Sequence, residues 1–317
     1  MLLRGPDSRQ PFDYTQGKPF GVIPLATPPS CSFWSLTPAP AGPWMALEWQ
    51  CVNGPLTQLV NVDSQTISFL FDDPTVDSHF LAWNPDGDSL YLKIGALTNP
   101  QIVCVEAGSR RVVIILPLSP NTYNLTVSPA DGSLLWALTN GIGAGSQLWA
   151  SAANGSNPHL LLSDAGNILG LMRFSPDGKH IAAIRLPDGQ SDLPPGALWV
   201  ADSDGTNVHL TAGADAGRGM FPVWSPNGEK IAYIGRTQPN DPSSINLSIL
   251  KVFDLRPSTF NLQLATPPVW SPDGGGLTFT RTSDGKMVLW FYEFSTGKTE
   301  KLFDDACCAG WISGGRK

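Results

Sequence analysis

The chain has 317 residues, a formal net charge of −7 and an apolar fraction of 42%, which is enough for a sizeable core. Only 15% of its residues are charged, and no run of Lys and Arg offers a stripe for phosphates, so we do not expect nucleic-acid binding. No apolar segment approaches the roughly 20 residues that a membrane-spanning helix needs, so we expect no membrane span.

The N-terminal segment, residues 1–30, differs in character from the rest of the chain. It has neither the apolar stretch nor the cleavage site of a secretion signal, so the sequence as given shows no signal peptide. We expect this segment to be disordered or non-native, and we place the folded part of the chain at residues 31–317.

One short turn sequence recurs through the folded part. It consists of an aromatic residue, Ser or Asn, Pro, Asp or Asn, and Gly. Proline presets φ at the second position of a tight turn, and glycine takes the position with φ > 0. The copies contain Trp83, Pro85 and Gly87; Phe174, Pro176 and Gly178; Trp224, Pro226 and Gly228; and Trp270, Pro272 and Gly274; a copy with one inserted residue contains Pro129 and Gly132. The glycines lie 45, 46, 50 and 46 residues apart, and such a period indicates stacked or radial repeats.

Each repeat follows one pattern of strands. An apolar segment ends at the turn, and three further short strands follow before the next copy. We expect these repeats to begin near residues 31, 80, 124, 171, 221 and 267, with an extra leading strand at 309–313. Four strands in about 45 residues is the propeller period. The sequence therefore predicts an all-β protein, a β-propeller of four-stranded antiparallel blades, with six blades, or seven or eight if the chain is truncated.

These repeats also resemble a known family. The turn followed by an apolar strand, together with the segments Leu148–Asn157 (LWASAANGSN) and Leu198–Asn207 (LWVADSDGTN), is similar to the TolB-type, WD40-like β-propeller repeat over about residues 31 to 317. The resemblance implies a scaffold for protein–protein contact outside the cytoplasm, periplasmic or secreted, in a bacterial protein. We expect a monomer that binds a protein or peptide partner.

The sequence contains no recognisable catalytic motif. The nucleophile elbow G-x-S-x-G is absent, and no two histidines have metal-ligand spacing. His79 lies just before a leading strand, where it is expected to face the central channel. We predict a non-catalytic binding protein. Two alternatives stay open: a propeller enzyme, lyase or hydrolase, with a site at the channel mouth, and a propeller fragment of a longer peptidase or sensor protein.

The loops opposite the recurring turns are the expected binding face, because loops on a rigid scaffold commonly carry binding residues. Carboxylates that converge there would receive a basic peptide or hold a divalent cation, and no other cofactor is expected. The alternative is that these aspartates are solvated and bind nothing. The candidate binding residues are Asp72, Asp73, Asp77, His79, Asp164, Asp215, Arg218, Asp304 and Asp305.

The five cysteines include no C-x-x-C pair, so a zinc site is not expected. Cys31 lies just before the first leading strand, and Cys307 and Cys308 lie just before the last. If the ring closes after six blades, these places meet. We therefore hypothesise a Cys31–Cys307 or Cys31–Cys308 disulfide, which needs an oxidising compartment. Free buried thiols are the alternative.

Overall fold

The computed structural model contains two compact units, unit 1 (Met1–Pro120 with Ala306–Lys317) and unit 2 (Asn121–Asp305). The residues that it describes are 2–4, 26–71, 73, 76–95, 99–119, 121–189, 194–215, 221–238, 240–241, 243–251, 257–260, 262, 268–304 and 310–312. The regular elements among these residues are all β-strands, and no helix there is long and apolar enough to cross a membrane.

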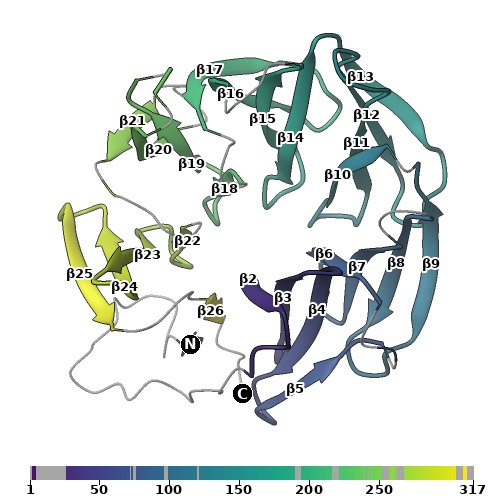
Figure 1. Cartoon of the computed structure of the whole chain (residues 1–317), viewed down its shortest axis with the longest axis horizontal. Coiled ribbons are helices and arrows are strands. Elements are labelled where there is room, and N and C mark those ends of the chain that lie inside the picture. The colour runs from purple at the N-terminus through teal and green to yellow at the C-terminus, as the bar shows by residue number, and fades with distance from the viewer. Residues whose placement is uncertain are drawn as a thin grey trace. The chain divides into compact units, whose positions relative to one another are not determined.

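Unit 1 contains two antiparallel sheets of four strands each, and in each sheet the strands lie in chain order (Figure 1). The first comprises β2 (Cys31–Pro38), β3 (Trp44–Cys51), β4 (Gly54–Asn61) and β5 (Thr66–Phe69), and the second β6 (Ser78–Trp83), β7 (Ser89–Ile94), β8 (Gln101–Glu106) and β9 (Val112–Pro117). One apolar cluster joins the two sheets: it contains Leu59 of the first together with Phe80 and Leu92 of the second, all buried. The sheets of unit 1 therefore pack face to face around a shared core.

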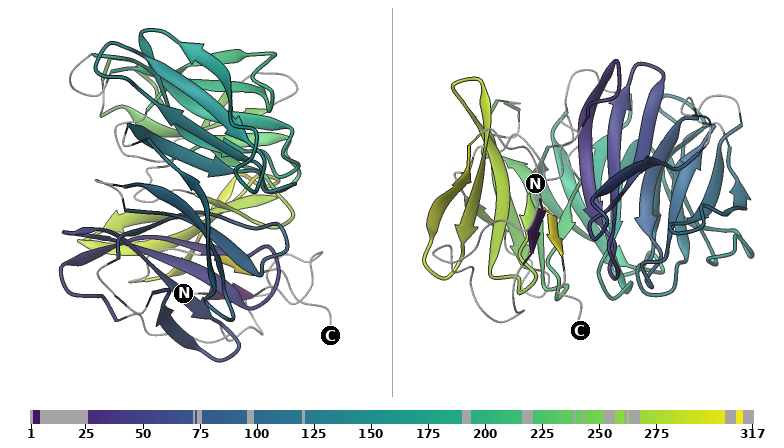
Figure 2. Two further views of the ribbon diagram at one scale, coloured as in Figure 1. Left: turned by 90° about the vertical axis from the view of Figure 1, so that its right-hand side faces the viewer. Right: turned by 90° about the horizontal axis from the view of Figure 1, so that it is seen from below.

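The two ends of the chain meet in unit 1. β1 (Leu2–Arg4) pairs in parallel with β26 (Gly310–Ile312), and Leu3 lies opposite Trp311. Figure 2 shows these two short strands side by side in purple and yellow. β1 lies within the segment that we expect to be disordered or non-native, residues 1–30.

Unit 2 contains four successive groups of four antiparallel strands (Figure 1). They are β10 (Thr122–Val127), β11 (Leu134–Leu138), β12 (Ser146–Ser151) and β13 (His159–Asp164); β14 (Asn167–Phe174), β15 (His180–Pro187), β16 (Gly196–Asp202) and β17 (His209–Ala214); β18 (Val223–Trp224), β19 (Lys230–Arg236), β20 (Ile245–Lys251) and β21 (Pro257–Phe260); and β22 (Val269–Trp270), β23 (Gly276–Ser283), β24 (Lys286–Glu293) and β25 (Lys298–Phe303). Three apolar clusters connect each group with the next.

Two details of unit 2 differ from the sequence prediction. β14 begins at Asn167, earlier than the expected start near residue 171, because a tight turn through Gly166 (φ 74°) replaces a longer loop. The second and third groups also merge into one eight-stranded sheet through the pair Ala214 and Gly235. The Asp215 N–H donates to the Ile234 carbonyl beside this pair, at 2.8 Å.

The recurring turn is closed by its own side chains. In the copy at Trp270, the Ser271 hydroxyl lies 2.9 Å from the Gly276 N–H, which donates to it, and it also donates to the carboxylate of Asp273. This hydrogen bond from Ser271 lowers the pKa of Asp273, although burial acts in the opposite direction. The copy at Phe174 has the same arrangement, and there the Ser175 hydroxyl is the main cause of the lowered pKa of Asp177.

The turn glycine is required for two reasons. Gly178 has φ +69°, which side chains disfavour. A Cβ atom there would also lie 2.7 Å from Ala130 Cβ and 2.8 Å from Ser128 Oγ, both in the turn of the preceding repeat. In unit 1, a Cβ on Gly87 would lie 2.5 Å from the Ala41 carbonyl oxygen. The motif therefore lets the backbones of neighbouring repeats approach each other.

The motif tryptophans connect neighbouring sheets by hydrogen bonds. The Trp270 indole Nε1–H donates to the Val223 carbonyl at 3.0 Å, and the Trp224 indole Nε1–H donates to the Arg173 carbonyl at 3.2 Å. In unit 1, the Trp83 indole Nε1–H donates to the Thr37 carbonyl at 3.0 Å. Each acceptor lies on the first strand of the preceding group of four strands, so the aromatic position contributes a directional bond as well as buried apolar area.

Candidate functional site

The loop-rich edge of unit 1 is the end of its sheets at which β2 and β6 begin, opposite the recurring turns. Asp77 precedes β6 at this edge, and the Gly95 N–H at the end of β7 donates to its Oδ1 atom at 2.8 Å. Lys93 lies opposite His79 in the β6–β7 register. Burial lowers the pKa of Lys93, and the negative charge of Asp77 counteracts this effect.

A buried glutamate orients the histidine of this edge. Glu48 on β3 is 3% exposed, and its Oε2 atom accepts a hydrogen bond from the Ser35 hydroxyl at 3.2 Å. Its Oε1 atom accepts from the Phe80 N–H at 3.3 Å and from His79 Nδ1. Because a carboxylate only accepts, Nδ1 is the donor in this contact. The contact fixes the ring and leaves Nε2 of His79 without a hydrogen-bond partner among the described residues.

His79 is accessible although its partner is buried. Its side chain is 39% exposed, compared with 4% for the side chain of Glu48. The ring is therefore held at one nitrogen and available at the other, an arrangement suited either to accepting a hydrogen bond or to transferring a proton.

An exposed tryptophan lies next to this network in the chain. The β2–β3 register shifts between Phe33 and Ser35, which makes Trp34 the extra residue of a β-bulge. Bulges redirect side chains, and Trp34 is 44% exposed while Phe33 packs against the buried ring of Trp49. An indole with this exposure on a rigid strand is typical of residues that anchor a binding partner.

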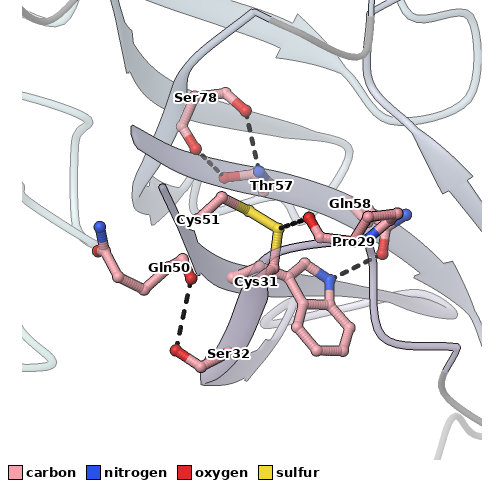
Figure 3. The surroundings of a disulfide bond; sticks show 9 residues. Pro29, Cys31, Ser32, Gln50, Cys51, Thr57, Gln58 and Ser78 are labelled. Atoms are coloured by element: carbon pink, nitrogen blue, oxygen red, sulfur yellow. Dashed lines mark hydrogen bonds between the residues drawn. A yellow bond between two sulfur atoms is a disulfide. The ribbon is translucent and has the colours of Figure 1, made fainter. Parts of the chain in front are cut away.

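The disulfide of the structure lies at the same edge and differs from the hypothesised one. Cys31 is bonded to Cys51, its direct partner in the β2–β3 register, with a Cα–Cα distance of 4.0 Å (Figure 3). The proposed Cys31–Cys307 and Cys31–Cys308 bonds are therefore wrong, because the sulfur of Cys31 is already bonded to that of Cys51 on the adjacent strand.

Two hydrogen bonds join the two sheets of unit 1 in the surroundings of the disulfide (Figure 3). The Thr57 N–H donates to the Ser78 hydroxyl at 2.9 Å, and the Thr57 hydroxyl donates to the Ser78 carbonyl at 2.6 Å (Figure 3). These contacts tie β4 to the start of β6. His79, the next residue along β6, is thus held at both its backbone and its ring.

Two of the predicted binding aspartates form ion pairs in unit 2. Arg185 binds Asp164 with both Nε (2.6 Å) and a terminal nitrogen (3.0 Å). Arg236 Nε lies 2.7 Å from Asp215 Oδ2, and both side chains are buried. Asp164 ends the outermost strand β13 and Asp215 directly follows the outermost strand β17, and each pairs with an arginine on the second strand of the next group. We interpret these carboxylates as structural connections between sheets.

The other predicted residues have separate positions. The Asp73 carbonyl accepts from the Val76 N–H at 3.3 Å, and exposed Asp304 binds Lys301 at 3.0 Å. Among the described residues no group of three or more His, Cys, Asp or Glu could hold a metal ion. Five candidate residues lie outside the described residues, namely Asp72, Arg218, Asp305, Cys307 and Cys308.

Sequence reasoning missed Glu48 and Trp34. Glu48 occupies an apolar strand, and its role depends on a histidine 31 residues away in the chain. Trp34 is redirected by a bulge that no local signal marks. One signal was available for the ion pairs: Asp164 and Arg185 have the same separation, 21 residues, as Asp215 and Arg236.

Comparison with known proteins gives the fold a family context. No family model matches the chain. The Tol-Pal system protein TolB of Ruthia magnifica subsp. Calyptogena magnifica is 24% identical over 147 residues, covering 46% of this chain and 32% of that protein. TolB of Alcanivorax borkumensis is 33% identical over 94 residues, covering 30% and 21%. The chain thus matches about a third or less of the length of these relatives.

Solved structures also match the fold of this chain. TolB from Acinetobacter baumannii matches with a TM-score of 0.53 and 16% identity, over 85% of this chain and 62% of that one. The chain carries TolB-type β-propeller repeats. Propeller enzymes share this fold. An oligogalacturonate lyase from Vibrio parahaemolyticus matches with a TM-score of 0.64 and 13% identity, over 88% of this chain and 80% of that one. A prolyl endopeptidase matches with a TM-score of 0.61 and 12% identity, over 86% of this chain and 42% of that one. At these identities, the likeness of this chain to the solved structures shows the fold alone.

Proposed function

We propose that this TolB-type repeat protein is a non-catalytic scaffold that binds a protein or peptide partner at the loop-rich edge of unit 1. The observation that carries the proposal is the fixed His79 ring, held by buried Glu48, whose other carboxylate oxygen accepts from Ser35, the residue after the exposed Trp34. Binding hot spots are enriched in tryptophan and need side chains whose orientation is set before the partner arrives. The carboxylates of Asp164 and Asp215 contribute less, because they already form ion pairs with Arg185 and Arg236.

We further propose that the protein acts outside the cytoplasm. The Cys31–Cys51 disulfide supports this location, since such bonds persist in oxidising compartments. The two relatives named as Tol-Pal system proteins also support it.

Selection from a random peptide library tests the binding proposal. Peptides selected on the immobilised protein are measured by fluorescence anisotropy against wild type, Trp34→Ala and His79→Gln. We expect each substitution to weaken binding by about tenfold or more, as for a hot-spot residue. His159→Gln is the matched control, because His159 is exposed on β13 of unit 2 and its ring bonds to the backbone carbonyl of Asn157. Peptides that bind the two variants as tightly as wild type would refute this site.

A second candidate function is proton transfer by His79 in a propeller enzyme. It is favoured by one observation, the contact between Glu48 and Nδ1, which leaves Nε2 to accept a proton. The test incubates the protein with oligogalacturonate, and separately with prolyl peptides, as the names of the two propeller enzymes with this fold suggest. Turnover that His79→Gln abolishes would support the enzyme and count against the scaffold, whereas turnover that His79→Gln leaves unchanged would count against proton transfer by His79.

A further inference from the structure

The outermost strand of the second sheet, β9, differs from the other outermost strands in its exposed side chains. Val112 and Val113 are each 42% exposed, and Ile114 is 62% exposed. Consecutive residues of a strand point to opposite faces, so apolar surface is open on both sides of β9. By contrast, the outermost strand β25 has the sequence KTEKLF, which includes two lysines and a glutamate. Among the described outermost strands, β9 alone has three consecutive apolar residues with this exposure.

The backbone edge of β9 is also available. β9 pairs with β8 on one side, and no described strand lies on its other side. The free edge of such a strand presents N–H and C=O groups that can pair with another extended chain. Edge strands that need protection usually carry charges, as β25 does. Within Val112–Pro117 no residue is charged.

The charge at the start of β9 restricts which chain can pair there. Arg110 and Arg111 directly precede the strand, and both are exposed. The antiparallel neighbour β8 already places a carboxylate beside these arginines. Oε1 of its last residue, Glu106, lies 3.3 Å from Arg111 Nε. An antiparallel strand on the open edge likewise places its C-terminal end beside the arginines. A second copy of β9 would bring uncharged residues there instead, since Leu118 and Ser119 follow the strand.

We propose that β9 is a strand-addition site for an extended apolar segment of a partner protein, followed at its C-terminal end by acidic residues. The added strand continues the sheet β6–β9 in antiparallel orientation, covers the side chains of Val113 and Ile114, and places its carboxylates beside Arg110. Backbone hydrogen bonds supply most of the affinity, and the arginines set the direction of the partner strand. This surface is separate from the loop-rich edge, so the inference does not depend on the proposed function.

The probe is a fluorescein-labelled peptide designed on β8, with an alternating Ile, Val and Thr segment that ends in two glutamates. Its binding is measured by fluorescence anisotropy on the full chain. We expect saturable binding that Ile114→Lys weakens by about tenfold or more. Leu160→Lys, which alters an exposed leucine of the outermost strand β13, is the matched control and leaves binding unchanged. Val113→Thr, which keeps a β-branched side chain, is a milder second variant and gives an intermediate loss.

A charge exchange tests the proposed direction. Reversal of both arginines, Arg110→Glu with Arg111→Glu, weakens binding of the acidic peptide, and a peptide ending in two lysines restores it. N-methylation of alternate peptide bonds abolishes binding, because it removes the backbone donors. Peptide binding that is absent, or equal in wild type and Ile114→Lys, overturns the proposal. Self-association that Ile114→Lys removes, without binding of the peptide, also overturns it and assigns the edge to a second copy.

Discussion

Two ion pairs of unit 2 occupy equivalent positions in successive groups of strands and differ in burial. Arg236 and Asp215 have side chains that are 1% and 0% exposed, whereas Arg185 and Asp164 are 31% and 15% exposed. Asp215→Asn leaves a buried guanidinium beside a neutral amide, and breaking a buried pair in this way costs about 3–5 kcal/mol. Asp164→Asn costs about 1 kcal/mol, because water reaches the partially exposed Arg185 and screens its charge.

Urea unfolding followed by tryptophan fluorescence measures the difference between these variants. In a thermal melt, where 1 kcal/mol shifts the melting temperature by roughly 2–4 °C in domains of about 150–250 residues, Asp215→Asn lowers it by about 6–20 °C. Asp304→Asn is the control, because the Lys301–Asp304 pair is exposed and its loss changes stability by less than about 1 kcal/mol. Equal losses for Asp164→Asn and Asp215→Asn would refute the argument that burial determines the cost.

Three further predictions follow from the bonds of the fold. Peptide mapping without reductant yields Cys31 linked to Cys51. Cys51→Ser removes this crosslink, whose cysteines are 20 residues apart, and lowers the free energy of unfolding in urea by about 3 kcal/mol. Trp270→Phe keeps the ring but removes the indole bond to the neighbouring sheet, with an expected loss of about 1–2 kcal/mol in the same assay. Ser271→Ala raises the pKa of Asp273 towards its ordinary value, as NMR titration of the carboxyl measures.

The pH dependence of the last prediction has a definite sign. The folded-state pKa of Asp273 is lowered below its ordinary value of 3.8, so its contribution to stability is present above 3.8 and is lost as the pH falls through the folded pKa. Ser271→Ala makes unfolding less sensitive to acid in that window. Unchanged acid sensitivity in the variant would contradict the assignment.

For Trp270→Phe the control is Trp34→Phe, whose half-exposed ring makes the expected change close to zero.

The sequence by itself determined the repeats, because a tight turn needs proline and glycine at fixed places. The glycine period therefore predicts four-stranded antiparallel sheets, and this fold class is what the structure shows. Sequence also singled out His79, from its place before a leading strand. Its binding role stays a prediction.

Only the tertiary structure decided which side chains meet. Glu48 reaches His79 across two sheets, and Cys31 bonds with Cys51 because antiparallel register brings adjacent strands together. Loop aspartates that looked free in the sequence, such as Asp215, are buried against arginines of the next group of strands. A periodic sequence specifies local hydrogen bonding within each repeat. The partner of a charged or sulfur-containing side chain depends on how neighbouring sheets pack, which local sequence does not encode.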